Sequence, residues 1–329
     1  MGRRKIFLTI SLIIAILASV SGCAKNTSEQ SNETSQKTPK FLTIGTANTG
    51  GAYYPIGIAM ADLLTNNLKI STTAQTTGGA VENNTLVGSG KVDLALTQGS
   101  MAYQAVNGNA PYDKKIENIS LMFSGLSKGV FQIIVNENSS IKTIQDLKGK
   151  KVVLGPPGGG AIPMTTDVFS VLGITMDDIE PVYVSYDDGT DGLTDGNYDA
   201  VVVQSAVPSS SIVQLTAAKK PVRLIGLDDE TIKKVTEKFP YYAQVDITKD
   251  VYGLTEDTNT VFVSNCVVVS NNLSDELVYN MTKLFFENVD RIAASHPSAK
   301  SLTLEGAVET LPIPLHPGAL KYFEEMGVK

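Results

Sequence analysis

From residue 41 onward, short apolar runs alternate with longer amphipathic stretches along the chain. The apolar runs have the length and β-branched content of strands, and the amphipathic stretches have the length of helices. Strands are expected at 41–44, 71–75, 92–96, 131–135, 151–154, 182–184, 200–203, 222–225 and 261–269. Helices are expected at 54–64, 81–88, 143–148, 162–172, 208–218, 229–238 and 274–294. This alternation predicts an α/β fold with a mostly parallel sheet.

The spacing of the strands also predicts two lobes. The two longest β-branched runs, 131–135 and 261–269, enclose a segment with four strands of its own. We therefore expect one lobe from residues 41–133 plus 262–329 and a second from 134–261, with the chain crossing between them twice. Two crossings leave a cleft, and α/β proteins bind small ligands in such clefts.

Residues 1–40 lack the alternating pattern. A basic start is followed by an apolar run over 6–20 and by Val20-Ser-Gly-Cys23, which predicts a secretory signal peptide over 1–22. The run is shorter than the roughly 20 residues that a bilayer span needs. Its end resembles the bacterial lipobox, which implies lipidation of Cys23 and an extracytoplasmic protein anchored to the membrane. Residues 24–40 are polar throughout and are expected to form a flexible tether.

The charge of the chain argues against a nucleic-acid partner. The formal net charge is −7, and removal of residues 1–22 takes away three cations and no acid, which leaves −10. Phosphate binding needs concentrated Lys and Arg. Only Arg223 and Arg291 remain after the signal peptide, and neither lies in a glycine-rich loop. A bidentate arginine clamp on an anion is therefore not expected, so backbone N–H groups, hydroxyls and helix N-termini would have to hold one.

Three strand-to-helix turns, 45–57, 76–82 and 155–161, are rich in glycine and hydroxyl groups. Each presents backbone N–H groups at a helix N-terminus, where the helix dipole favours an anion. Neither GxxxxGK[ST] nor GxGxxG is matched, so no nucleotide cofactor is expected. The turns indicate a binding cleft. Its candidate contacts are Thr49, Gly50, Gly51, Tyr53, Tyr54, Thr77, Gly78, Gln98, Ser100, Gly159, Gly160, Ala161 and Gln204.

The enzyme-like motif is Gly125-Leu-Ser-Lys-Gly129, which fits GxSxG. A nucleophile elbow places its serine between a strand and a helix, whereas a strand follows here. Ser127 is therefore not expected to be catalytic, although a secreted α/β hydrolase stays open as an alternative. His296 and His316 each precede a proline at a helix edge, and no Asp is placed to make a triad evident.

The two cysteines and two histidines are too few for a metal cluster or a disulfide framework. Lipidation of Cys23 would leave Cys266 without a partner, and its apolar surroundings predict a buried small side chain in a strand. The acidic run from Asp187 to Asp195 lacks the Asp or Asn and the Glu that an EF-hand needs at its third and twelfth positions. Because Asp187, Asp191 and Asp195 are spaced by four, they are expected on the solvated face of a short helix.

Six strings resemble the TAXI receptors, the solute-binding proteins of one branch of TRAP transporters. They are GGAYYPIG (50–57), TGGAVEN (77–83), KVDLALTQ (91–98), DLKGKKVVLGPPGGG (146–160), GNYDA (196–200) and PLHPGALKYFEEMG (314–327). The resemblance implies the type II periplasmic-binding-protein fold, capture of a small solute by lobe closure, and delivery to a TRAP membrane permease driven by an ion gradient. It also implies ligands such as glutamate and C4 or C5 dicarboxylates.

The chain departs from the family pattern at two places. Gly158 to Ala161 stands where members carry Gly-Ser-Gly-Thr, so two hydroxyl donors are missing, and Leu126 to Gly129 replaces a Tyr-Pro-Glu-like string. A lost hydrogen bond is worth about 0.5–1.5 kcal/mol net, so the ligand is either less polar or held by other groups. Lys128 could supply a replacement cation or be a solvated loop lysine.

The sequence therefore predicts a lipid-anchored, monomeric receptor without cofactor or metal that binds a small organic acid. Two alternatives stay open. One is the secreted hydrolase using Ser127, and the other is a surface antigen or adhesion module that keeps the fold without transport.

Overall fold

A computed structural model describes residues 39–329 of the chain. The expected signal peptide, the lipidated Cys23 and nearly all of the tether lie outside the described residues. The strands are β1 (Phe41–Gly45), β2 (Ser71–Gln75), β3 (Leu94–Gln98), β4 (Ser120–Asn136), β5 (Lys151–Val153), β6 (Glu180–Val182), β7 (Ala200–Ser205), β8 (Val222–Ile225), β9 (Tyr242–Ile247) and β10 (Thr258–Val269).

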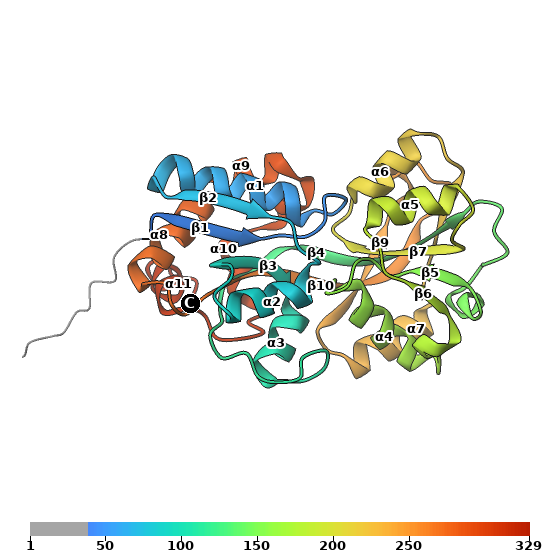
Figure 1. The fold of residues 1–329 in the computed structure, drawn as a ribbon, viewed down its shortest axis with the longest axis horizontal. Helices are drawn as coiled ribbons and strands as arrows, with labels where there is room; N and C mark the ends of the chain where they lie inside the picture. Colours follow the sequence, from blue (N-terminus) through green and yellow to red (C-terminus); the bar gives the residue numbers. More distant parts are fainter. Residues whose placement is uncertain (1–38) are drawn as a thin grey trace, which may run out of the picture. The chain divides into compact units, whose positions relative to one another are not determined.

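The helices cover both halves of this strand array. They are α1 (Tyr53–Leu63), α2 (Ala80–Gly88), α3 (Gly99–Asn107), α4 (Ala161–Val171), α5 (Tyr186–Thr194), α6 (Ser210–Ala217), α7 (Asp229–Lys238), α8 (Asp275–Phe286), α9 (Val289–Ser295), α10 (Leu304–Glu309) and α11 (Pro317–Glu325). Helices α1, α2, α3, α8, α9 and α11 surround β1 to β3, whereas α4 to α7 surround β5 to β7 (Figure 1).

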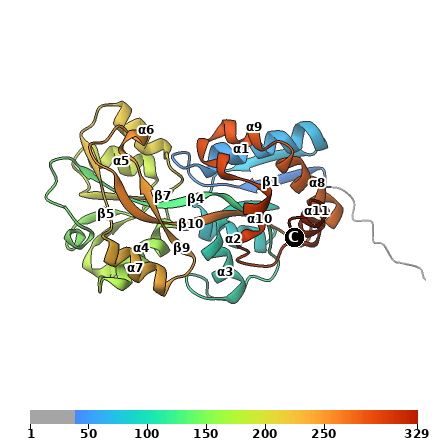
Figure 2. The ribbon, with the colours of Figure 1, turned by 180° about the vertical axis from the view of Figure 1, so that it is seen from behind.

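The sheet order is β2-β1-β3-β10-β4-β7-β5-β6, with β8 added to β4 and β9 added to β10. Strands β1, β2 and β3 pair in parallel, and so do β5, β6 and β7. The long strands β4 and β10 pair antiparallel to each other and connect the two parallel groups (Figure 2). The mostly parallel sheet expected from the sequence is therefore interrupted by an antiparallel pair at its centre.

Two large hydrophobic clusters lie on either side of this central pair. One cluster is formed by residues between Val130 and Val263, and the other is formed mainly by residues before Leu126 and after Val267. The second cluster thus joins both ends of the described chain. Burial of this apolar area is the main stabilising contribution to each half, at about 25 cal/mol per Å².

The expected strands are all present within a few residues, but some elements differ. The run at 131–135 is only the end of β4, which begins at Ser120 and includes the GxSxG motif. Strand β9 was not expected, because the polar residues of its exposed positions hide the apolar alternation. The segment expected as a helix at 143–148 forms a single 3₁₀ turn, Ile144–Leu147.

The helix expected over 274–294 is two helices, α8 and α9, separated at Glu287 and Asn288. The Asn288 side-chain amide donates a hydrogen bond of 2.8 Å to the Leu284 carbonyl. Asparagine side chains compete with the helical backbone for such acceptors. This local bond accounts for a break that the apolar periodicity does not indicate.

Candidate functional site

The glycine-rich loops after β1, β2 and β5 meet around a small cavity between the two halves of the sheet. Parallel strands of one group end at the same edge of a sheet, which brings the loops that follow them together. The cavity has a volume of about 30 Å³, room for roughly two to three water-sized groups. It is lined by Ala47, Asn48, Gly51, Ala52, Tyr53, Gly78, Gly79, Ala80, Gly159, Gly160, Tyr186, Gln204, Ser205 and Asn265.

Four helices begin at this cavity: α1 at Tyr53, α2 at Ala80, α4 directly after Gly160, and α5 at Tyr186. The first N–H groups of a helix have no acceptor within it, and the helix dipole is positive at that end. Among the described residues that line the cavity, none is Asp, Glu, Lys, Arg or His. A negative group here would therefore be held by neutral donors.

Two tyrosines from opposite halves contribute buried phenol groups. The Tyr53 hydroxyl donates to Asn265 Oδ1 at 2.7 Å, and the Asn265 amide donates to Ser127 Oγ at 2.9 Å. The Tyr186 hydroxyl donates to the Gln204 carbonyl at 3.0 Å. Burial raises the pKa of both phenols above the ordinary value, so both stay protonated.

Buried amide side chains without a hydrogen-bond partner lie beside the cavity. Both polar atoms of the Gln98 amide, and Nε2 of Gln204, are buried and unpaired. Gln98 packs directly against Gly160, where a Cβ would lie within 2.5 Å of Gln98 Cδ. An unpaired buried polar group costs about 1–3 kcal/mol, so these amides are available donors and acceptors for a ligand.

The two halves also cap each other's helices across the site. The carbonyl of Gly158, before α4, accepts hydrogen bonds from the N–H groups of Val81 and Glu82 at the start of α2, at 2.9 and 3.1 Å. Reciprocally, the carbonyl of Gly50, before α1, accepts a bond of 3.3 Å from the N–H of Ser211 in α6. These contacts exist only when the halves are close together.

Further polar contacts close the side of the site near α5 and α6. The Ser205 hydroxyl accepts the Ala52 N–H at 3.2 Å, and the Ser209 hydroxyl donates to the Gly50 carbonyl at 3.2 Å. The Thr49 hydroxyl donates to Asp187 Oδ2 at 3.1 Å. The sequence placed Asp187 on a solvated helix face, and this was wrong, because Asp187 contacts the first loop while Asp191 and Asp195 are exposed.

The sequence profile of the NMT1-like family matches residues 44–327. The chain belongs to the NMT1-like family. A curated Escherichia coli (strain K12) protein, named for its proposed binding of aliphatic sulfonates, is 33% identical over 82 residues. That match covers 25% of this chain and 25% of the relative.

Solved structures share the fold of this NMT1-like protein. PhnD1 from Prochlorococcus marinus (MIT 9301), solved with methylphosphonate, is 12% identical, with a TM-score of 0.54 over 88% of this chain and all of that one. A Listeria monocytogenes protein named as a candidate L-cystine ABC transporter is 13% identical, with a TM-score of 0.50 over 83% of this chain and 98% of that one. The expected α/β fold of the type II periplasmic binding proteins is confirmed.

The structure brings six of the thirteen candidate contacts to the lining of the cavity. These are Gly51, Tyr53, Gly78, Gly159, Gly160 and Gln204. Gln98 lies directly behind Gly160 with its amide unpaired. Gly50 and Thr49 take part in the contacts between the lobes rather than in the lining.

The remaining four candidates lie outside the lining. The Thr77 hydroxyl bonds to Thr46 and Asn83 and supports the second loop. Ala161, Ser100 and Tyr54 are in the first turns of α4, α3 and α1, and the Ser100 hydroxyl is buried without a partner. These positions follow the glycine-rich loops in sequence, but their side chains lie behind the cavity wall or away from it.

Four polar residues of the lining were missed by the sequence analysis: Asn48, Tyr186, Ser205 and Asn265. Asn265 lies in the middle of β10, opposite Ser127 in β4, so its position depends on how the two long strands pair. Tyr186 begins the helix that the acidic run forms. Its aromatic side chain, at the start of an amphipathic segment after a strand, is a signal that could have been used.

The motif around Ser127 lies within β4, so the expectation that it is no nucleophile elbow is confirmed. Ser127 is buried, and its hydroxyl accepts the Asn265 amide. Cys266 is buried in β10 as expected, and burial raises the pKa of its thiol. Lys128 was considered as a cation or a loop lysine, but it is an exposed strand residue with Nζ 4.5 Å from the centre of the Phe262 ring.

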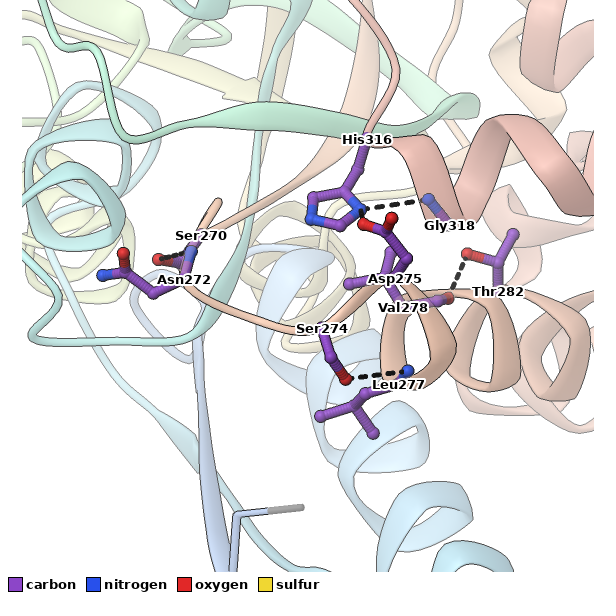
Figure 3. A network of polar contacts seen from close by, with 9 residues as sticks. All are labelled: Ser270, Asn272, Ser274, Asp275, Leu277, Val278, Thr282, His316 and Gly318. Carbon is purple, nitrogen blue, oxygen red and sulfur yellow. Dashed lines mark hydrogen bonds and ion pairs between the residues drawn. The ribbon is translucent and has the colours of Figure 1, made fainter. Parts of the chain in front are cut away.

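Both histidines cap helices, as their positions before proline suggested. Nδ1 of His316 accepts the Gly318 N–H at 3.2 Å at the start of α11, and Nδ1 of His296 does the same for Ser298 at 3.3 Å (Figure 3 shows His316). Asp275 Oδ1 lies 3.8 Å from His316 Nδ1, although no Asp neighbour was evident from the sequence. Because that nitrogen accepts a hydrogen bond, the pair does not have the geometry of a catalytic dyad.

The two arginines of the described chain are both remote from the cavity. Arg223 in β8 donates to the carbonyls of Glu137, Ser139 and Ile141, and Arg291 lies in α9. Within residues 39–329, no cluster of three or more His, Cys, Asp or Glu side chains has the arrangement of a metal site. The same part of the chain contains no helix with the length and hydropathy of a membrane span.

Proposed function

We propose that this NMT1-like protein is an extracytoplasmic receptor that captures a small organic acid between its lobes and delivers it to a membrane permease. The observation that carries this proposal is the convergence of four helix N-termini on a cavity with neutral walls. Such termini favour a negative group. At α2 this contribution would come from the helix dipole, because the N–H groups of Val81 and Glu82 are bonded to the Gly158 carbonyl. The name of the Escherichia coli relative, which refers to sulfonates, also supports an anionic solute.

The proposed lobes comprise residues 41–133 plus 262–329 and residues 134–261. The boundaries fall inside β4 and β10, the two strands that connect the hydrophobic clusters. Small changes along these strands would open and close the cleft. The proposed ligand contacts are the lining residues, with Gln98 behind Gly160 and Thr49 and Gly50 holding the closed form.

For the permease we propose a TRAP-type transporter, because the six strings that resemble TAXI receptors span the described chain. An ABC transporter is the competing partner, as in the name of the Listeria protein with the same fold. The two transporter classes differ in energy source. If the partner is TRAP-type, uptake by cells that carry the receptor should stop when the ion gradient is dissipated. If the partner is an ABC transporter, uptake should stop when ATP is depleted while the gradient is kept.

Membrane attachment would come from lipid on Cys23, after removal of residues 1–22. Cys23→Ser should then release the receptor from the membrane fraction without changing its solute affinity. A membrane-bound Cys23→Ser protein would contradict the anchor.

The solute class is tested by thermal shift and calorimetry on the full chain. The panel contains acetate to octanoate, succinate, glutamate, methanesulfonate and methylphosphonate. Saturable binding of one or more carboxylates is expected. The absence of saturable binding across the panel would refute the proposal, and hydrolysis of an ester that disappears in Ser127→Ala would favour the hydrolase instead.

A further inference from the structure

A second cavity borders the first. It has a volume of about 240 Å³ against about 30 Å³ for the first, and Gly159 lines both. Its walls come from both lobes: Val81 and Pro111 on one side, and Ile162 and Pro163 of α4 on the other. The second cavity is therefore part of the same cleft and would be closed by the same lobe movement.

The size of the first cavity limits what it can enclose. Roughly two to three water-sized groups fit in it, which suits a carboxylate and little else. The rest of a larger ligand would need further space, and the second cavity borders the same glycine. The wall there consists mainly of hydrocarbon from Val81, Ala110, Pro111, Ile162 and Pro163.

The charges of the second cavity argue against a second carboxylate on the ligand. Asp167 is the one ionisable residue among the described residues that line it, and it is an acid. Its Oδ2 accepts hydrogen bonds from Tyr242 at 2.8 Å and Tyr241 at 3.1 Å, which hold the carboxylate in place. Lys238, the cation that acts on Asp167, does not line the cavity, so a second ligand carboxylate there would face Asp167 and be repelled by it.

We infer that the ligand is a monocarboxylate with an apolar substituent, its carboxylate in the first cavity and its hydrocarbon in the second. This inference rests on the proposed function and narrows its solute class from organic acids in general. An aliphatic chain gains affinity by leaving water for the apolar wall, whereas a dicarboxylate of equal length meets Asp167.

Calorimetry on the full chain tests the inference with the monocarboxylates acetate to octanoate and the dicarboxylates succinate to suberate, which are compared at equal carbon number from butyrate and succinate upward. Each methylene that enters the second cavity should tighten binding about four-fold, the equivalent of about 0.8 kcal/mol. Dicarboxylates should bind more weakly than the monocarboxylates of the same length.

A pair of variants on α4 tests whether the rise of affinity with chain length arises in the second cavity. Thr166 lines the second cavity, and Ser170, one turn further on, does not. Both are exposed, so neither substitution disturbs a core. Thr166→Leu should fill part of the cavity and move the best chain length to a shorter acid, with propionate affinity kept as the sign of an intact fold. Ser170→Leu should leave the length profile unchanged.

The outcomes separate the inference from the function on which it rests. If short acids bind but affinity does not rise with chain length, or dicarboxylates bind as tightly as monocarboxylates, the inference is overturned and the receptor function stands. A Thr166→Leu protein with an unchanged length profile also overturns it. If no acid binds at all, both the inference and the proposed function fail.

Discussion

Gly160→Ala should weaken ligand binding without unfolding the protein. Gly160 has φ −79° and ψ −11°, a conformation that alanine adopts readily, so the backbone of its own lobe tolerates the change. The new Cβ would overlap the amide of Gln98 in the opposite lobe, 2.5 Å from Cδ and closer still to Nε2. That amide is fully buried, so it must shift within the packed interior to admit the methyl group. The clash therefore exists only when the lobes are closed.

Overpacking of this kind costs about 1–3 kcal/mol. Because the cost falls on the closed form alone, the dissociation constant should rise by about 5- to 150-fold. The unfolding midpoint of the ligand-free protein should change little. Calorimetry with the tightest acid of the panel gives the affinity, and small-angle scattering gives the fraction of closed molecules at saturating ligand.

Gly99→Ala is the matched control. Gly99 begins α3 outside the cavity lining, and its Cβ would lie 3.4 Å from Pro312 Cγ and the Ser264 carbonyl, an ordinary contact distance. Affinity should change by less than about three-fold, since no atom must move. Gln98→Ser in the Gly160→Ala protein should restore closure in the scattering measurement. If Gly160→Ala binds as tightly as Gly99→Ala, the packing of Gln98 on Gly160 is not a feature of the ligand-bound form.

Three further predictions follow from single contacts. Thr49→Val removes the hydroxyl that donates a hydrogen bond to Asp187 across the lobes. The rate of ligand release, measured by stopped flow, should rise about 2- to 10-fold. An unchanged rate would exclude a role of this hydrogen bond in closure. Burial lowers the pKa of His296 and His316, so as the pH drops the unfolded chain takes up protons before the folded one. The free energy of unfolding in urea titrations should therefore fall as the pH drops from about 7.5 through about 6.5, the pKa of histidine in the unfolded chain. The double His→Asn variant, which keeps a cap acceptor, should flatten this loss. Ser127→Ala should cost about 1–3 kcal/mol of stability, because it leaves a buried amide unpaired, and should leave any background esterase activity unchanged.

The sequence was most informative where function depends on backbone. The glycine-rich turns after β1, β2 and β5 could be placed at one end of the sheet, because parallel strands of one group point the same way. Gly51, Gly78 and Gly160 therefore reached the cavity lining as expected. Their role requires no side chain, so the sequence position alone defines it.

Side chains at the centre of the site could not be placed in the same way. Asn265 reaches the cavity because β10 pairs with β4 in a register that sets it opposite Ser127, and no local pattern encodes that register. Asp187 has the spacing of a solvated helix face, but the loop before α1 from the opposite lobe packs on it. Both positions are decided by the contact between lobes rather than by the propensity of a segment.

The same contact between lobes explains how ligand and closure are linked. Closure adds the bonds that Gly158 accepts from α2 and that Gly50 accepts from α6, each worth about 0.5–1.5 kcal/mol net. It also buries the unpaired amides of Gln98 and Gln204, each at a cost of about 1–3 kcal/mol. The two contributions oppose each other and are of similar size, so these polar contacts by themselves do not strongly favour closure. A carboxylate that accepts from the buried amides and the helix N-termini removes the opposing cost, and a ligand bound more tightly by the closed form shifts the population toward it.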